Sequence, residues 1–309
     1  MYKRLIPFLL AGQLLIAAAV NYSYDAAGRL VRVDYGAAGS IDYTYDKAGN
    51  LLSRVTQAAG GSGVITSINT AGAGPDIAQN DWIEIKGLNL VPANTPAAGV
   101  IWSTAPEFAA GQMPTQIGGV SVTVNGKAAF VFYYCSAVTS PCASDQVNVL
   151  TPIDNTVGQV NIVVTSAAGV SAPYAVNLKS VAPSILLFSP PYVVAVHSDY
   201  SLLGPTSLYP GLSTPAKPNE PVSLYAVGFG LPTAALSNGS SSQSGSLATL
   251  PVCTVGGNPA AVSFAGLISP GLYQINLTIP AGTPSGDNPI GCTFKGASTP
   301  GGDQITVGQ

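Results

Sequence analysis

The chain has 309 residues, of which 47% are hydrophobic and only 8% are charged, and its formal net charge at pH 7 is −3. An average soluble domain has about 25% charged residues, so this chain carries unusually few ions. The small negative charge and the lack of any basic stripe in the sequence argue against a nucleic-acid partner. With 35 glycines and 25 prolines, the composition favours turn-rich β structure, and the length favours about two domains.

The first 19 residues have the three parts of a secretory signal. Lys3 and Arg4 form a basic start, residues 5–16 are mostly apolar, and residues 17–19 are small alanines that precede a cleavage site. The competing interpretation is a retained membrane anchor. However, the apolar stretch of residues 5–20 is sixteen residues long, whereas a bilayer-spanning helix needs roughly 20. We therefore expect a chain that is exported, without a stable membrane span after cleavage, and that acts outside the cell or at its surface.

A short repeat with a period of 21 residues fills most of residues 20–57. Each copy should form a β-hairpin with a Tyr-rich strand, an Asp-x-x-Gly turn and a returning strand. Both copies have the pattern Tyr-x-Tyr-Asp-x-x-Gly-[Arg/Asn]-Leu, as Tyr22-Ser23-Tyr24-Asp25-Ala26-Ala27-Gly28-Arg29-Leu30 and Tyr43-Thr44-Tyr45-Asp46-Lys47-Ala48-Gly49-Asn50-Leu51.

This pattern resembles the tyrosine–aspartate (YD) repeat of rearrangement-hotspot (RHS) proteins. The resemblance implies hairpins that, in long arrays, wind into a shell around a cargo. Repeat arrays need about three units to bury a continuous core, so two units are expected to form a short β meander without activity of its own. An alternative is that the chain is a truncated C-terminal piece of a large RHS-type surface or toxin-delivery protein.

A second, unrelated unit occurs twice after a Gly-rich linker at residues 58–63. Its tight turns are predicted at Asn125-Gly126 and Gly256-Gly257, because both central residues of such a hairpin turn need positive φ. Each turn is followed by a Gln-x-Asn strand with apolar residues between the polar ones, which indicates one buried and one wet face. The paired stretches are 124–132 with 146–152, and 255–263 with 274–280.

The duplicated unit predicts an all-β fold with two immunoglobulin-like sandwiches in series after the YD-repeat hairpins. We assign the first sandwich to residues 64–181, a proline-containing junction to residues 182–205 and the second sandwich to residues 206–309. The polar Ser/Gly stretch at residues 238–247 is expected to be a mobile loop. Limited proteolysis should therefore cut first near residues 57–63 and 238–247.

Ordered motifs across residues 64–309 resemble the uncharacterised C-terminal β domain of secreted acidobacterial (Solibacter-type) proteins, which is similar in style to immunoglobulin-like TIG modules. That family implies no established activity. The motifs include Gly118-Gly119-Val120, Gln146-Val147-Asn148, Val196-His197-Ser198-Asp199 and Gly271-Leu272-Tyr273-Gln274-Ile275-Asn276.

Catalytic and metal-binding patterns are weak in this sequence, so we predict neither catalytic residues nor a metal or cofactor site. His197 is the single histidine, and its near neighbour Asp199 would share one face of a strand with it. A catalytic relay instead places the base between nucleophile and orienting group, so His197 is expected to hydrogen-bond locally at the domain junction. The cysteines lack C-x-x-C spacing, and the carboxylates are too sparse for a calcium loop.

The four cysteines of an exported chain should pair. Of the three possible connectivities we favour Cys135–Cys142 and Cys253–Cys292. The first pair closes a short insertion between paired strands. The second joins two segments that could be neighbours in one sheet or could face each other across the core. Pairing across domains would require a stricter geometry.

These features favour a secreted or cell-surface, non-catalytic structural or interaction protein of the adhesion type, with an unknown protein or glycan as partner. A carbohydrate-binding module is the alternative, since a sugar-binding face would expose two or three aromatic rings on a sheet. A hydrolase centred on His197 is a third hypothesis. The candidate rings are Trp82, Trp102, Tyr133, Tyr134, Tyr192, Tyr200, Tyr209, Tyr225 and Tyr273.

Overall fold

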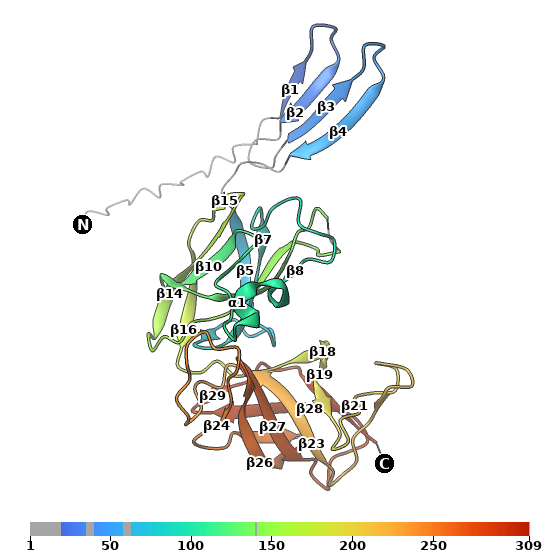
Figure 1. Cartoon of the computed structure of the whole chain (residues 1–309). Helices are drawn as coiled ribbons and strands as arrows, with labels where there is room; N and C mark the ends of the chain where they lie inside the picture. The colour runs from blue at the N-terminus through green and yellow to red at the C-terminus, as the bar shows by residue number, and fades with distance from the viewer. Residues whose placement is uncertain (1–19, 35–39, 58–62, 140, 309) are drawn as a thin grey trace, which may run out of the picture. The chain divides into compact units, whose positions relative to one another are not determined.

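The computed structural model describes residues 20–34, 40–57, 63–139 and 141–308 (Figure 1). The expected signal, residues 1–19, and all but the last residue of the expected linker at 58–63 lie outside this described part. The chain divides into two compact units, residues 1–61 and 62–309. Each unit is described by itself below.

The first unit is one antiparallel sheet in the order β1-β2-β3-β4. β1 (Asn21–Tyr24) and β2 (Leu30–Asp34) form one hairpin, and β3 (Ser40–Tyr45) and β4 (Leu51–Gln57) form the other. The aspartate of the repeat motif forms the turn of each hairpin. Asp25 Oδ1 accepts the backbone N–H groups of Ala27 and Arg29 at 2.9 Å, and the equivalent Asp46 Oδ1 accepts those of Ala48 and Asn50 at 2.8 Å. The two predicted YD hairpins are confirmed.

The first sandwich, in the second unit, packs two sheets around a core of alternating Ile and Val side chains such as Ile85, Val122 and Val147. One sheet has the order β11-β10-β14-β16-β6, with β9 and β15 at its sides, and the other has the order β5-β7-β13-β12-β8. The bounds are β5 (Val64–Thr70), β6 (Ile77–Ala78), β7 (Trp82–Leu88), β8 (Val100–Ile101), β9 (Gln116–Ile117), β10 (Val120–Val124), β11 (Lys127–Ala128), β12 (Phe130–Cys135), β13 (Asp145–Leu150), β14 (Gly158–Ser166), β15 (Gly169–Val170) and β16 (Tyr174–Lys179); η2 (Trp102–Thr104) and α1 (Pro106–Ala109) follow β8.

The second sandwich has its own core, which includes Leu224, Tyr273, Ile275 and Phe294. Its strands form one continuous path, β18-β19-β30-β28-β25-β26-β27-β23-β20-β21-β22, because the long strand β26 passes from one layer to the other. The bounds are β17 (Ser184–Ile185), β18 (Leu187–Ser189), β19 (Tyr192–Val193), β20 (Ala195–Val196), β21 (Leu202–Leu203), β22 (Ser213–Thr214), β23 (Pro221–Val227), β24 (Gly245–Ser246), β25 (Val252–Val255), β26 (Asn258–Ser269), β27 (Leu272–Thr278), β28 (Gly286–Phe294), β29 (Ala297–Ser298) and β30 (Gln304–Val307).

Both predicted glycine turns occur where the sequence places them. Val124 pairs with Lys127 across Asn125 (φ 53°) and Gly126 (φ 75°), and Val255 pairs with Asn258 across Gly256 (φ 60°) and Gly257 (φ 78°). Positive φ at both central positions gives the turn a twist that matches the strands it joins. In the first sandwich, however, the chain after this turn crosses to the opposite sheet, where β12 pairs with β13 and β8 rather than with β10.

One expected boundary and the expectation for the Ser/Gly loop differ from the structure. Residues 182–205 are not a separate junction, because β17 and β20 pair with β23 and β19 pairs with β30, so the second sandwich begins at Ser184 rather than at residue 206. The Ser/Gly loop at 238–247 is docked against the first sandwich. The Met113 N–H donates to the Gly239 carbonyl at 2.7 Å, and the Ser241 N–H donates to the Gly111 carbonyl at 3.0 Å.

Candidate functional site

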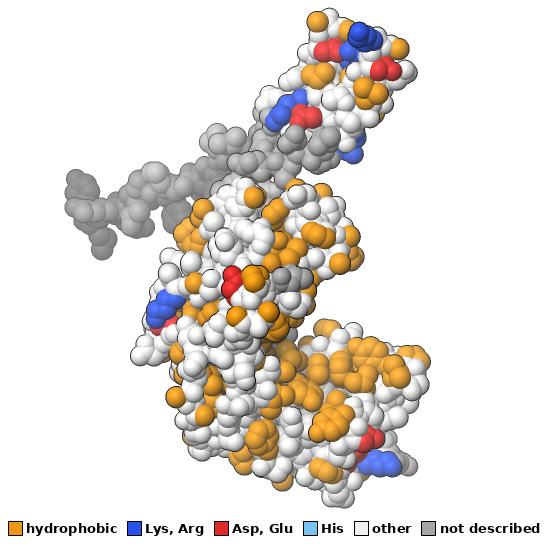
Figure 2. Space-filling view, viewed as in Figure 1, with side chains coloured by type: hydrophobic (Ala, Val, Ile, Leu, Met, Phe, Trp, Pro, Cys, Tyr) orange, Lys and Arg blue, Asp and Glu red, His pale blue; other side chains and the backbone are white. Residues whose placement is uncertain are grey.

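An open hollow of about 420 Å³ lies between the two sandwiches. We call it the junction groove. Its first wall is the outer face of β7, β13 and β12 with η2, and its second wall is the turn between β26 and β27 with the segment between β17 and β18. Hydrophobic side chains gather on both sides of the indentation between the sandwiches in Figure 2. The lining residues used below are Glu84, Trp82, Trp102, Phe132, Asn148 and Leu272.

Three aromatic rings form the floor of the groove. The ring centroids of Trp82 and Trp102 are 5.5 Å apart, and Phe132 lies 5.3 Å from the first and 5.0 Å from the second, all edge-to-face. Phe108 of α1 stacks on Trp102 at 4.9 Å. Such contacts hold each ring in one orientation. Trp82, Trp102 and Phe132 all remain half-buried, so part of each ring is open to the groove.

A hydrogen bond across the sandwiches orients Trp82. Its indole N–H donates to the carbonyl of Pro270, 2.6 Å away, in the turn before β27. The neighbouring residue, Gly271, lacks a Cβ. A Cβ at this position would lie 2.8 Å from the Trp82 ring and closer still to the Leu150 side chain, which is too close for either contact. The glycine therefore permits the close approach of the turn to the aromatic floor.

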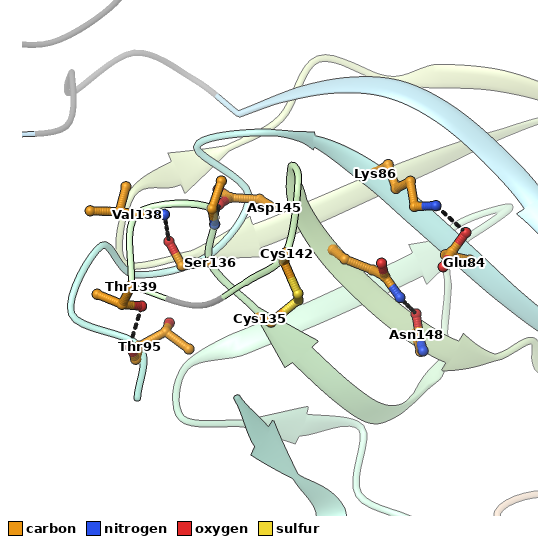
Figure 3. The surroundings of a disulfide bond; sticks show 12 residues. Glu84, Lys86, Thr95, Cys135, Ser136, Val138, Thr139, Cys142, Asp145 and Asn148 are labelled. Carbon is orange, nitrogen blue, oxygen red and sulfur yellow. Dashed lines mark hydrogen bonds and ion pairs between the residues drawn. A yellow bond between two sulfur atoms is a disulfide. The ribbon is translucent and has the colours of Figure 1, made fainter. Parts of the chain in front are cut away.

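Polar groups from two strands border the aromatic floor. Glu84 of β7 faces Asn148 of β13 in the strand register, and both side chains lie on the outer face of the sheet (Figure 3). The Gln146 side-chain amide donates to Asn148 Oδ1 at 2.9 Å. Glu84 is also paired with Lys86, with 2.7 Å between the carboxylate oxygen and Nζ. The groove thus combines an apolar floor with an amide and a neutralised carboxylate at its edge.

A β-bulge places Phe132 on this floor. The register between β12 and β13 shifts between Val131 and Tyr133, so Phe132 is the extra residue opposite the pair Val149 and Asn148. A bulge bends its strand and re-aims the side chain of the inserted residue. The aromatic candidates from the sequence were tryptophans and tyrosines, so Phe132 was not among them, and sequence alternation does not reveal such a shift.

A buried carboxyl group lies next to the aromatic floor in the sequence. Asp81 precedes Trp82 and is fully buried; its Oδ2 accepts the Ala78 N–H at 3.0 Å, while Oδ1 has no hydrogen-bond partner among the described residues. Burial raises the pKa of Asp81 well above its usual range, which favours the neutral acid. The adjacent Asn80 donates to Gln243 Oε1 at 2.9 Å, so the Ser/Gly loop is also tied to this region.

The tyrosines that the sequence offers as candidates for a sugar-binding face differ in how far they are buried. Tyr134 and Tyr273 are core residues and cannot stack on a ligand. Tyr133, Tyr192, Tyr209 and Tyr225 are half-buried. Tyr200 is 76% exposed and lies outside the junction groove. Of the predicted rings, only Trp82 and Trp102 line the junction groove.

His197 makes local hydrogen bonds, and Asp199 is not one of its partners. Its Nδ1 lies 2.6 Å from Glu220 Oε1, and its Nε2 lies 3.0 Å from Thr214 Oγ1. Asp199 instead accepts the backbone N–H and the hydroxyl of Ser201, at 3.0 and 2.6 Å. The local hydrogen-bonding role therefore applies, but within the second sandwich rather than at its contact with the first.

The four cysteines form two disulfides in the structure, Cys135–Cys142 and Cys253–Cys292. Figure 3 shows the first, at the end of β12 beside Asp145. Asp145 accepts the N–H of Ala137 at 2.9 Å and that of Leu90 at 3.0 Å, so it anchors the loop that the disulfide closes. Cys253 and Cys292 are directly opposite each other on β25 and β28.

Within the described residues, no group of three or more His, Cys, Asp or Glu side chains is arranged to hold a metal ion. None of the helices in the same part of the chain has the length and apolar character needed to cross a bilayer.

Comparison with protein families matches residues 22–62 to the RHS Repeat family. No match was found among curated proteins. Among solved structures, the chain is similar to SGBP-B of the Bacteroides ovatus mixed-linkage glucan utilization locus, in complex with a mixed-linkage heptasaccharide. The identity is 11% and the TM-score 0.33, over 88% of this chain and 54% of that protein.

Two other solved structures have comparable scores. SGBP-B from a complex xyloglucan utilization locus in Bacteroides uniformis is 13% identical, with a TM-score of 0.22 over 79% of this chain and 49% of that one. The Yersinia pseudotuberculosis adhesin InvE is 8% identical, with a TM-score of 0.21 over 80% of this chain and 58% of that one. The chain therefore spans about half the length of these proteins.

Proposed function

We propose that this chain is an exported, non-catalytic interaction protein that binds its partner in the junction groove. The observation that carries the proposal is the floor of Trp82, Trp102 and Phe132, three rings held edge-to-face yet half-open to a hollow of about 420 Å³. Ligand sites commonly lie between domains and combine an apolar surface with a few polar groups that fix orientation. Here Glu84 and Asn148 supply the polar groups.

Two features support an extracellular or cell-surface location. The RHS Repeat match covers residues 22–62, and the structure pairs all four cysteines in disulfides. Disulfides persist mainly in oxidising compartments. In this proposal residues 1–19 act as a signal peptide, and residues 64–309 represent the TIG-like acidobacterial β domain.

The intrinsic fluorescence of the protein offers a specific test of the groove. The chain has two tryptophans, and both line the junction groove, so a change in tryptophan emission reports on that site alone. Ligands identified on a glycan array and from a peptide display library would be titrated into the full chain. We expect at least one to change the emission and to lose affinity about tenfold or more in Trp102→Ala.

Tyr24→Ala is the matched control, because Tyr24 is an exposed aromatic residue of the YD-repeat sheet. It should leave both the emission change and the affinity unaltered. Binding that is the same in Trp102→Ala as in the parent chain would refute the groove as the binding site. Turnover of a bound ligand into products would refute the non-catalytic assignment.

The exposed edge of the YD-repeat sheet favours a second candidate function. Tyr45 donates its hydroxyl to the carbonyl of Leu30 in the preceding repeat at 2.9 Å, whereas the equivalent Tyr24 on β1 is 60% exposed. Within the described residues, β1 pairs only with β2. A further hairpin could pair there, as in a larger RHS-type protein of which this chain would be a C-terminal piece. The genomic sequence upstream would test this, since coding for more YD repeats is expected.

A further inference from the structure

The two sandwiches repeat one arrangement on the outer faces of their central sheets. In the first, Gln146 Nε2 donates to Asn148 Oδ1 at 2.9 Å, and Asn148 faces Glu84 across the sheet. In the second, Gln274 Nε2 donates to Asn276 Oδ1 at 2.7 Å, and Asn276 faces Ser223. Asn148 of the first pair lies at the edge of the junction groove, and both residues of the second pair line a separate open pocket of about 250 Å³.

Each sandwich also has a β-bulge in the strand next to its Gln–Asn pair, at an equivalent position. The β12–β13 register shifts between Val131 and Tyr133, and the β26–β27 register shifts between Val262 and Phe264. The inserted residues are Phe132, which lines the groove, and Ser263, which lines the second pocket. Each bulge places its inserted residue next to the asparagine of the neighbouring strand. The second pocket is therefore the counterpart of the part of the groove around Asn148.

An exposed aromatic ring completes the second pocket. Tyr200 lines it and is 76% exposed. The residue has a φ of 68°, a conformation that costs energy for a residue with a side chain. The surrounding turn fixes it, because Tyr200 N–H donates to the His197 carbonyl and His197 N–H to the Ser201 carbonyl, both at 3.0 Å. Asp199 caps the turn through Ser201.

The polar groups of the pocket leave donors and acceptors for a ligand. Asn276 Oδ1 accepts hydrogen bonds from Gln274 and, at 2.9 Å, from the Ser223 hydroxyl. The Asn276 Nδ2 donors and the Gln274 Oε1 acceptor make no hydrogen bond to the described residues. Each hydroxyl of a sugar both donates and accepts, so neighbouring hydroxyls match this amide pair. The described lining residues include no Lys or Arg, which disfavours an anionic ligand.

We propose that the Tyr200 pocket is a carbohydrate-binding subsite of the second sandwich, where the Tyr200 ring packs on the apolar face of a neutral sugar and the Gln274–Asn276 pair hydrogen-bonds its hydroxyls. An apolar ring beside a few fixed polar groups is the composition of a small-ligand site. The assignment goes beyond the proposed groove function and depends on it only in treating the chain as a binding protein.

The test uses the full chain with cellohexaose, xylohexaose, maltohexaose, mannohexaose and chitohexaose as probes, followed by calorimetry and by tryptophan emission. We expect at least one hexasaccharide to bind, and we expect Tyr200→Ala and Asn276→Ala each to lower its affinity about tenfold or more. Tyr200→Phe should retain binding within about twofold, because the ring face remains. Tyr200 is exposed, so Tyr200→Ala should keep the parent melting temperature, and Tyr24→Ala should behave as the parent chain.

Failure of this proposal and failure of the groove proposal give different results. Since both tryptophans line the groove, binding at the Tyr200 pocket should persist in Trp102→Ala even if the groove binds nothing. The carbohydrate assignment is overturned if no hexasaccharide binds, or if Tyr200→Ala and Asn276→Ala bind as the parent chain does. It is also overturned if a peptide binds in the pocket and none of the sugars does.

Discussion

The indole N–H of Trp82 donates to the carbonyl of Pro270 at 2.6 Å, joining a strand of the first sandwich to a turn of the second. This bond does two things at once. It contributes to the docking of the sandwiches, and it fixes one of the three rings that form the floor of the junction groove. The stability of the sandwich contact and the shape of the groove therefore depend on the same residue.

Trp82→Phe tests this coupling. The change keeps an aromatic ring but removes the donor, so the carbonyl of the buried Pro270 loses its partner. We expect a loss of about 1 kcal/mol in the free energy of unfolding, measured by urea denaturation. Trp102→Phe is the matched control, since Trp102 has ring contacts but no side-chain hydrogen bond among the described residues. Equal losses in the two variants would contradict a specific role for the bond.

Limited proteolysis tests the docking of the Ser/Gly loop. Its backbone bonds to Gly111 and Met113, and the Asn80–Gln243 side-chain bond, hold it against the first sandwich. Cleavage requires local opening of the chain. We therefore expect the first cut near residues 57–63 and protection of residues 238–247, unlike the expectation from composition alone. Gln243→Ala should increase cleavage in the loop; an early cut there in the parent chain would contradict the docking.

Features set by local sequence were predictable from the sequence, whereas features set by tertiary contacts were not. The glycine dipeptides at 125–126 and 256–257 predict their turns because positive φ is a local requirement. The Gln-x-Asn alternation likewise predicts which side chains leave the core. The bulges at Phe132 and Ser263 were not predicted, since a register shift depends on the partner strand. The groove was missed for the same reason: Trp82, Phe132 and Leu272 meet only when two sandwiches dock.

Stability should fall as the pH rises through the acidic range. Burial raises the pKa of Asp303 to about 6, and it also raises that of Asp81. Between the unfolded pKa near 4 and the folded value, the folded chain binds more protons than the unfolded chain, so the free energy of unfolding decreases with pH. Asp303→Asn should remove the decrease near pH 6 and raise stability at pH 7 by on the order of 2 kcal/mol.

The measurement is urea denaturation of parent and variant between pH 4 and 8. Asp199→Asn is a suitable control, because hydrogen bonds from the Ser201 side chain and backbone lower the pKa of Asp199. This substitution should therefore lower the free energy of unfolding at pH 7, whereas Asp303→Asn should raise it. Stability of the parent chain that rises steadily between pH 4 and 7 would contradict a dominant contribution from the two buried acids.

The final prediction concerns the two disulfides, which should differ in accessibility and in their effect on stability. Cys253 and Cys292 are both buried, whereas Cys135 is buried but Cys142 is half-buried. A reductant reaches the less buried disulfide more easily. We therefore expect mild reduction of the native chain to open Cys135–Cys142 first, and non-reducing peptide mapping should show this order.

Loop length predicts that the Cys135–Cys142 disulfide also contributes less to stability than the Cys253–Cys292 disulfide. The sequence separations are 7 and 39 residues, and chain-entropy estimates give about 2.5 and about 4 kcal/mol for loops of these lengths. The short loop is also held by the hydrogen bond from the Ala137 N–H to Asp145, which does not depend on the disulfide. The pair Cys135→Ala and Cys142→Ala should therefore remain folded with a modest loss of melting temperature, and Cys253→Ala with Cys292→Ala should lose more. The reverse order, or a mapped peptide that joins cysteines of different sandwiches, would reject these assignments.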